Sequence, residues 1–337
     1  MIPKPALPRQ QPPRWQQVLR EAFSRPDELL QFLELNPALA AVDTATLRDF
    51  PLRVSRGFAA RMKKGDPRDP LFLQVWPQTA EAASAPGFKL DAVGDLHKLK
   101  PGGIIHKYRG RALVVATGAC AVHCRYCFRR HFPYAETLAA RDHWREALAQ
   151  LAADPSIEEV ILSGGDPLSL PDDKLAEFAD ALENIPHLNR LRIHTRQPVV
   201  LPERVDEGLL DWLGRGRLHK VIVLHVNHAN ELDNSVAAAL QRIRELDIPL
   251  LNQAVLLRNI NDSADVLEQL SKRLFEFGVL PYYLHLLDRV QGAAHFEVQE
   301  EKAGMLMREL SSRLPGYLLP QLVREEPGAP AKTRVAW

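Results

Sequence analysis

The sequence predicts an α/β protein built as a partial (β/α)6 barrel that follows a helical N-terminal region. Three observations support this fold: six short β-branched runs after residue 110, helical segments between them, and helical spacing of apolar residues near the N-terminus. Short apolar strands that alternate with amphipathic helices form parallel βα units. In a barrel of such units, residues that carry chemistry lie at the C-terminal ends of the strands.

The N-terminal region, residues 1–95, is expected to be mainly helical. Its first 13 or so residues are rich in proline and are expected to be irregular. Over residues 14–35, apolar side chains such as Trp15, Leu29 and Leu33 recur at helical spacing. We expect helices to continue, with breaks, to about residue 95.

The barrel is expected over residues 96–320, followed by a C-terminal segment at 321–337. Its six strands are expected at 112–117, 160–163, 191–194, 221–225, 250–255 and 282–286. Segments with helical periodicity lie between the strands, for example at 142–152 and 235–246. Each strand is therefore expected to be followed by a helical crossover that keeps the sheet parallel.

Composition excludes several classes of protein. At 337 residues and 46% hydrophobic, the chain can bury one large core. Its 43 basic and 42 acidic residues give no sign of a nucleic-acid or anionic-membrane partner. The chain begins without a continuous apolar stretch, and no run approaches the length of a membrane span. We therefore expect a cytoplasmic protein that acts on a small molecule.

All three cysteines lie in the run Cys120-Ala-Val-His-Cys124-Arg-Tyr-Cys127, which has C-x3-C-x2-C spacing. Three thiolates on one loop can hold three irons of a four-iron cluster and leave the fourth iron open to another ligand. The chain has no fourth cysteine to fill that position. The spacing therefore favours a [4Fe-4S] cluster with one open iron.

Two other interpretations of the cysteine run have to be weighed. A disulfide with a spare thiol is disfavoured, because three neighbouring cysteines with none elsewhere do not form a secreted disulfide framework. A Cys3His zinc site that includes His123 is chemically allowed, and it would make the protein a scaffold that binds a partner without catalysis. Zinc modules usually divide their ligands into two separated pairs, whereas here all four fall within eight positions. Iron and sulfide content distinguishes the two metals.

The second expected strand leads into the run Ser163-Gly164-Gly165-Asp166. Two glycines let backbone groups approach a ligand closely. The run is not a phosphate-binding P-loop, because the Gly-Lys-Ser/Thr ending of that motif is absent.

Two further polar residues occur within apolar strand runs. His225 ends the fourth expected strand and Gln253 lies in the fifth. A lone histidine in a strand is most often a core residue whose hydrogen bonds are satisfied. Two polar residues at equivalent depth around one barrel favour a pocket that both of them line.

The cysteine run, with aromatic Tyr126 before its last cysteine, resembles that of the radical S-adenosylmethionine enzymes, whose fold is a partial barrel of this type. In those enzymes S-adenosylmethionine binds the open iron and is reduced to give a carbon radical. The resemblance implies that Cys120, Cys124 and Cys127 hold the cluster. It implies that Gly164, Gly165 and Asp166 hold the methionine amino group of S-adenosylmethionine. Tyr126, His225 and Gln253 are further residues expected to bind a cofactor.

Several ordered motifs narrow the resemblance to the lysine 2,3-aminomutase family. They lie at residues 106–111, 129–132, 163–166, 196–202, 225–231 and 252–258, and the resemblance runs from about residue 45 to the C-terminus. It implies an isomerase that converts L-lysine to β-lysine by radical migration of the amino group. Within the family, the chain is most similar to the bacterial form that makes (R)-β-lysine for modifying elongation factor P.

The same resemblance implies a second cofactor, pyridoxal 5′-phosphate, held covalently by a lysine in a loop of small residues. Lys332, in the loop at 326–333, matches that lysine. Arg111 matches a phosphate contact of the family. The second phosphate partner is an arginine in the family and Lys107 in this chain, which keeps the charge but loses the planar fork.

Substrate contacts are implied at both ends of the amino acid. Arg129 matches the family arginine for the substrate carboxylate, and Asp288 matches an acid that holds the distal ammonium. Where the family has a second aspartate, this chain has Glu325. Two acids favour lysine over glutamate, whose side chain they would repel. An aminomutase for another amino acid, glutamate or arginine, is the alternative within this class.

The resemblance also implies partners. They are L-lysine, an electron donor such as flavodoxin or ferredoxin, and a functional link to an elongation factor P lysyl-ligase. The fermentative member of the family continues into a cysteine-rich zinc-binding tail, but this chain has no cysteine after Cys127. Neither that zinc nor the associated mode of oligomerisation is therefore expected.

Overall fold

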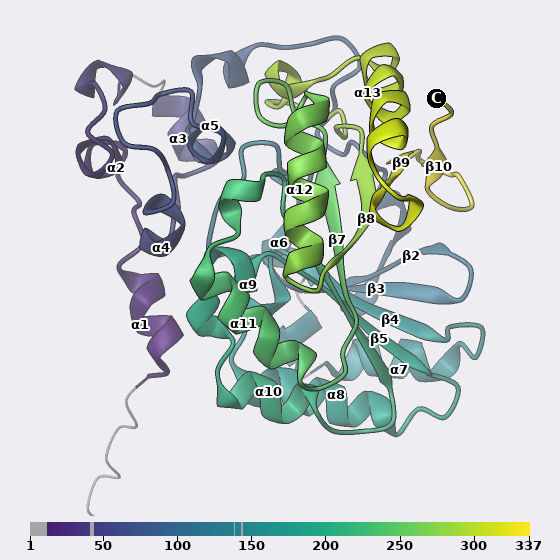
Figure 1. Cartoon of the computed structure of the whole chain (residues 1–337). Helices are drawn as coiled ribbons and strands as arrows, with labels where there is room; N and C mark the ends of the chain where they lie inside the picture. The colour runs from purple at the N-terminus through teal and green to yellow at the C-terminus, as the bar shows by residue number, and fades with distance from the viewer. Residues whose placement is uncertain (1–11, 41–43, 138, 143) are drawn as a thin grey trace, which may run out of the picture.

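The computed structural model describes residues 12–40, 44–137, 139–142 and 144–337. Its centre is one ten-stranded sheet in which the strands lie in chain order. Neighbours from β3 to β9 are parallel, whereas β1, β2 and β10 are antiparallel additions at the two edges. The sheet curves into an open, partial barrel with helices on its outer face (Figure 1).

All six strands expected from the sequence are present. They are β3 (Arg111–Thr117), β4 (Glu159–Gly164), β5 (Arg190–Thr195), β6 (His219–Leu224), β7 (Leu250–Val255) and β8 (Leu280–His285). Four further strands were not anticipated: β1 (Leu99–Lys100), β2 (Ile104–Tyr108), β9 (Gln321–Arg324) and β10 (Thr333–Arg334). The C-terminal segment at 321–337 therefore contributes to the sheet, while the expected domain boundaries stay a prediction.

Six helices connect the parallel strands. They are α7 (Arg145–Ala153), α8 (Asp172–Glu183), α10 (Glu207–Leu213), α11 (Asn234–Arg244), α12 (Ala264–Glu276) and α13 (Glu300–Arg313). Helix α12 shows why they form: Ser263 caps its first turn, and Leu267, Leu270 and Leu274 face the sheet at helical spacing. Burial of each such leucine contributes about 1.5–3 kcal/mol. None of the helices within the described ranges has the length and hydrophobicity of a membrane span.

The helix expected at 142–152 begins three residues later than predicted. Trp144 precedes its first residue and has a left-handed backbone conformation, with φ of 64°. The Trp144 ring is fully buried and packs on Phe178 with 4.3 Å between ring centroids. Burial of the indole therefore outweighs continuation of the helical backbone at this position. The smaller helices α6 (Tyr134–Thr137) and α9 (Gln197–Val200) follow β3 and β5.

The N-terminal region is helical, as expected, and lies along one side of the barrel (Figure 1). Its helices are α1 (Arg14–Arg20), α2 (Pro26–Phe32), α3 (Thr44–Asp49), α4 (Arg56–Ala59) and α5 (Pro70–Val75). Their apolar side chains form a second core that includes Ala121 and Val122 of the cysteine run. Backbone bonds from His123 to Arg53 and from Arg125 to Gln74 add to this contact. The N-terminal helices thus hold the cysteine run against the end of the barrel.

The Gly164-Gly165 pair permits a close approach between β4 and the segment that leads into the cysteines. Gly164 has φ of +125°, a conformation that side chains rarely adopt. A Cβ atom on Gly165 would lie 2.5 Å from the Ala119 carbonyl oxygen and 2.7 Å from the Gly118 carbonyl carbon. Gly165 N–H also donates to the Thr117 carbonyl at 2.6 Å. The two glycines therefore fix where the cysteine run begins.

We predict that Gly165→Ala destabilises the protein by about 1–3 kcal/mol, because the added methyl group meets backbone atoms that cannot rotate away. The free energy of unfolding in denaturant measures this. Gly57→Ala is the matched control, since Gly57 is helical and a Cβ atom added there would have nothing within 4 Å. An equal free energy of unfolding for Gly165→Ala and the wild type would contradict the packing argument.

Candidate functional site

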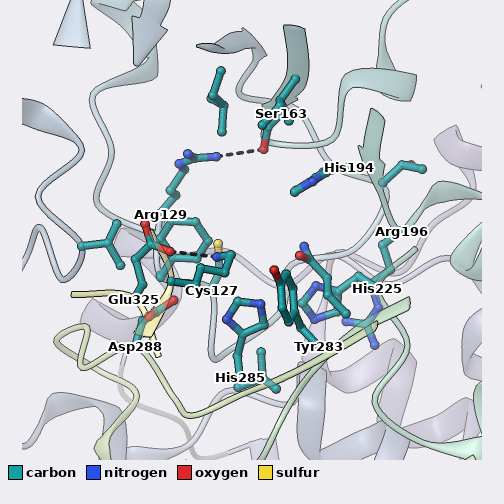
Figure 2. A pocket seen from close by; sticks show the side chains of 18 of the residues that line it. Cys127, Arg129, Ser163, His194, Arg196, His225, Tyr283, His285, Asp288 and Glu325 are labelled. Atoms are coloured by element: carbon teal, nitrogen blue, oxygen red, sulfur yellow. Dashed lines mark hydrogen bonds and ion pairs between the residues drawn. The ribbon is translucent and has the colours of Figure 1, made fainter. Parts of the chain in front are cut away.

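One cavity, with a volume of about 480 Å³, lies at the C-terminal ends of the parallel strands. Every residue that the sequence motifs singled out for metal, cofactor or substrate binding lines it. These residues are Lys107, Arg111, Cys120, Cys124, Tyr126, Cys127, Arg129, Gly164, Gly165, Asp166, His225, Gln253, Asp288, Glu325 and Lys332. Figure 2 shows Asp288 and Glu325 on one side of the cavity and His225 with Arg196 on the other.

The three thiols of the cysteine run are free and line the cavity. Burial raises the pKa of the Cys127 thiol to about 11 and that of Cys120 well above its usual range. Thiolates in such a setting need bound cations to stay deprotonated. The donor set and its burial therefore suit a cationic iron–sulfur cluster core.

His123 does not join the thiols. Its Nδ1 lies 2.8 Å from the Pro51 carbonyl oxygen, its ring stacks on Phe50, and it is absent from the cavity lining. Among the residues that the structure describes, no three His, Cys, Asp or Glu side chains are arranged around a single metal ion. The Cys3His zinc site considered from the sequence is therefore not assembled.

The Asp166 carboxylate accepts four hydrogen bonds from the protein, two at each oxygen. Its Oδ1 accepts from Thr195 Oγ1 at 2.8 Å and from Leu168 N at 3.1 Å. Its Oδ2 accepts from Arg196 N at 2.7 Å and from Gln197 N at 3.0 Å. Burial nevertheless raises the pKa of this carboxyl group above its ordinary value. The carboxylate joins the ends of β4 and β5, while its expected contact with S-adenosylmethionine stays a prediction.

Tyr126 and His225 form one wall of the cavity. Their rings stack with centroids 5.7 Å apart and an angle of 24° between planes. The Tyr126 hydroxyl accepts from Arg196 Nη1 and Asn227 Nδ2, each at 2.7 Å. Burial lowers the pKa of His225 to about 3, so its imidazole is neutral at physiological pH. A neutral ring can offer one donor and one acceptor to a ligand.

Ion pairs at the opposite side form a chain of alternating charge. Arg129 Nε donates to Asp95 Oδ2 at 2.7 Å, and Lys107 Nζ lies 2.6 Å from Asp95 Oδ1. Lys107 Nζ also lies 3.6 Å from Glu325 Oε1. Lys332 Nζ donates to Glu325 Oε2 at 2.8 Å. Three cations therefore share two buried carboxylates, which leaves net positive charge for an anionic ligand.

The two acids that were expected to hold a substrate ammonium differ in their surroundings. Burial opposes ionisation of Glu325, but Lys332 and Tyr108 hold its pKa below the usual range. The Asp288 carboxylate has no hydrogen bond or ion pair within the described part of the chain, and burial raises its pKa to about 7 despite Lys332. Asp288 is thus the acid that is free to accept a cationic ligand.

Several cavity residues had not been anticipated. They are Asp95, Arg192, His194, Arg196, Tyr283, His285 and Arg334. His194 and His285 occupy C-terminal parts of β5 and β8, so the strand-end rule that identified His225 could have found them. Both have an Nε2 atom without a partner among the described residues. Asp95 gives no local signal, because it lies in an irregular segment and its partners are distant in the sequence.

Comparisons with known proteins agree with this geometry. Residues 114–270 match the family model described as the Radical SAM superfamily. The chain is 48% identical to L-lysine 2,3-aminomutase of Escherichia coli, over 95% of this chain and 93% of that protein. It is 47% identical to the Haemophilus influenzae protein of the same name, over 96% and 95%. The protein of that name from Clostridium subterminale is 30% identical, over 96% of this chain and 77% of that protein.

Solved structures are less similar. Streptococcus suis SuiB bound to S-adenosylmethionine is 14% identical, with a TM-score of 0.48 over 65% of this chain and 51% of that chain. Membership of the Radical SAM superfamily implies a [4Fe-4S] cluster and S-adenosylmethionine as cofactors. On the identity and coverage of its relatives, the chain belongs to the L-lysine 2,3-aminomutase family of radical S-adenosylmethionine enzymes.

Proposed function

We propose that the protein is an L-lysine 2,3-aminomutase, which moves the amino group of L-lysine from C2 to C3 and so forms β-lysine. The observation that carries this proposal is the content of one cavity. Three free thiols, the amine of Lys332 and the unpaired carboxylate of Asp288 line the same space. These are the groups needed for a cluster, a covalently held cofactor and a cationic substrate.

We assign the cluster to the three cysteine thiols and S-adenosylmethionine to the adjacent wall formed by Tyr126, His225, Gln253 and the turn at 164–166. When bound, the cluster and S-adenosylmethionine supply a carbon radical that abstracts hydrogen, and pyridoxal 5′-phosphate delocalises the unpaired electron as nitrogen migrates. The protein positions these groups and excludes competing reactants.

The residues present at the other side fit pyridoxal 5′-phosphate. Lys332 Nζ lies 5.9 Å from the centroid of the Tyr283 ring, beside a flat surface on which a planar ring can lie. The Arg111 guanidinium rests over Tyr108 and makes no ion pair with a carboxylate in the described residues. It is therefore available to a phosphate group, with Lys107 as the second cation.

Glu325 is the hydrogen-bond and ion-pair partner of Lys332. Covalent attachment requires Lys332 to lose its proton, and Glu325 Oε2 is the hydrogen-bond acceptor at 2.8 Å. The same carboxylate accepts from the Tyr108 hydroxyl, which keeps it in place when the amine reacts. We therefore propose that Glu325 serves the cofactor lysine, in addition to the ammonium contact implied by the family.

We assign the substrate contacts to side-chain groups of Arg129 and Asp288 that have no protein partner among the described residues. Arg129 uses Nε for Asp95 and Nη1 for Ser163, at 2.7 and 2.9 Å, so its Nη2 remains for the substrate carboxylate. Asp288 lies across the cavity from His225 (Figure 2) and binds the ε-ammonium. Glutamate would place a carboxylate beside Asp288 and would be repelled.

We further propose that the β-lysine formed serves modification of elongation factor P by a lysyl-ligase, with a flavodoxin- or ferredoxin-type donor. The sequence resemblance supports this. Intact-mass analysis of elongation factor P tests it, using ligase supplied with the enzyme's product. Because the two isomers add the same mass, the comparison is the fraction of elongation factor P that is modified: a fraction no larger than with α-lysine would contradict the proposal.

We predict that Ala at any one of Cys120, Cys124 or Cys127 abolishes reductive cleavage of S-adenosylmethionine, because two thiolates do not fix a cluster with one open iron. The measurements are iron and sulfide content and the yield of 5′-deoxyadenosine under strong reductant. His123→Ala is the control and should retain both, since His123 lies outside the cavity lining. Wild-type yield from a cysteine variant would refute the cluster assignment.

We predict that Lys332→Ala retains iron and sulfide but loses the absorption band of covalently bound pyridoxal 5′-phosphate, together with lysine isomerisation. Borohydride reduction followed by peptide mass mapping checks the attachment site. Lys302→Ala, at an exposed lysine paired with Asp262, is the control and should bind the cofactor normally. A pyridoxyl group found on another lysine of the wild type would overturn this choice.

We predict that kcat/KM for lysine falls as pH drops through about 7, because burial raises the pKa of Asp288 to about 7 and only its anion holds an ammonium. Asp288→Asn should lower kcat/KM at higher pH by about ten- to a hundredfold, and it should remove this acidic limb. Asp173→Asn, at an exposed position of α8, is the control. Unchanged lysine kinetics in Asp288→Asn would move ammonium recognition elsewhere.

A further inference from the structure

Arg196 directly contacts one of the three cysteines. It follows β5, and its side chain is only 6% exposed. Its Nη1 donates to Cys124 Sγ at 2.8 Å. This contact brings a buried guanidinium to a thiol that we assign to the cluster.

Three other groups hold the guanidinium in this orientation, and a fourth holds the Arg196 backbone. Its Nη2 donates to Gln74 Oε1 at 2.7 Å and to Glu231 Oε2 at 2.8 Å. Its Nη1 also donates to the Tyr126 hydroxyl at 2.7 Å. The Arg196 backbone N–H is held by Asp166. The side chain therefore has little freedom to leave the sulfur atom.

Glu231 makes withdrawal of Arg196 still more costly. Its carboxylate is fully buried, and Oε1 accepts from the backbone N–H groups of Asn227 and His228 at 2.9 and 3.1 Å. Without Arg196, Oε2 would be left as part of a buried charge without its ion-pair partner. The negative charge of Glu231 partly offsets the positive charge of Arg196. Arg196 therefore acts on Cys124 mainly through its hydrogen bond and only weakly through long-range electrostatics.

A hydrogen bond to a cluster sulfur has a defined electrochemical effect. Reduction adds negative charge to the cluster, and donors to its thiolate ligands stabilise that charge and raise the reduction potential. A buried site strengthens the interaction because the local dielectric is low. Cys124 therefore receives a donor that favours the reduced state, from which S-adenosylmethionine is cleaved.

We propose that Arg196 is a positioning residue that raises the reduction potential of the cluster through its hydrogen bond to Cys124. Its bond to Gln74 of α5 also makes this potential depend on the N-terminal helices. The inference rests on the proposed function, since it requires a cluster on Cys124. A residue that only stabilises the fold would leave the potential of a loaded cluster unchanged.

The test compares redox titrations of reconstituted wild type, Arg196→Met and Arg196→Lys. Electron paramagnetic resonance measures the amount of reduced cluster at each potential. At a fixed solution potential, the ratio of reduced to oxidised cluster should fall about tenfold in Arg196→Met, which corresponds to about 59 mV for one electron. Arg196→Lys keeps the positive charge but lacks the planar guanidinium, so its ratio of reduced to oxidised cluster should lie between those of wild type and Arg196→Met. Arg204→Met is the matched control, because Arg204 is equally buried but pairs with Asp172 outside the cavity lining.

The outcomes separate the two proposals. Wild type that holds no iron and sulfide would overturn the proposed function and this inference together. Loaded Arg196 variants with the wild-type potential would overturn this inference alone. If the variants do not hold a cluster, wild type labelled with arginine that carries 15N only in the guanidinium decides by pulsed electron paramagnetic resonance, without S-adenosylmethionine. Nitrogen coupling to the reduced cluster supports the contact, and its absence refutes it.

Discussion

The rest of the site depends on the hydrogen bonds that the buried carboxylate of Asp166 accepts. The carboxylate accepts four hydrogen bonds, three of which join the turn after β4 to Thr195 at the end of β5 and to Arg196 and Gln197 after it. A carboxylate buried to this degree is stable only when its oxygens are satisfied, so the two strand ends are held in one relative position. The Gly164-Gly165 turn then meets the segment before the cysteines, and Arg196 is held where it reaches Cys124.

Among the described residues of the cavity, most charged groups have ion-pair partners, whereas Asp288 and Arg111 do not. Arg129, Lys107 and Lys332 share Asp95 and Glu325, and such pairing is what makes buried charges tolerable. Among the described residues Asp288 lacks a partner, and the result is a pKa near neutrality. Ionisation of this unpaired acid lowers the stability of the protein, and the proposed cationic substrate would supply the missing partner. The proposed specificity for a substrate ammonium and the expected pH dependence thus have one physical origin.

The N-terminal helices contribute to the site as well as to the fold. Their core packs against Ala121 and Val122, and Gln74 of α5 bonds to Arg196, Tyr126 and Glu231. The cysteine run is consequently held by contacts with N-terminal segments that are distant from it in the sequence. A change in the N-terminal packing would therefore reach the cysteines through backbone contacts and through Gln74, although no residue of the N-terminal region at 1–95 belongs to the expected binding set.

The sequence by itself predicted the six parallel strands and the helical N-terminal region, because periodicity is a local property. The expected binding set came from its motifs and their resemblance to a family, and the individual roles stay predictions. It did not predict the edge strands β1 and β10, which have two residues each and too little pattern to detect. Only the tertiary structure decided which groups are paired. Asp95 meets Arg129 across 34 positions, and Gln74 meets Arg196 across 122. These partners, and therefore the difference between engaged Glu325 and free Asp288, arise from packing between distant segments, for which sequence spacing carries no information.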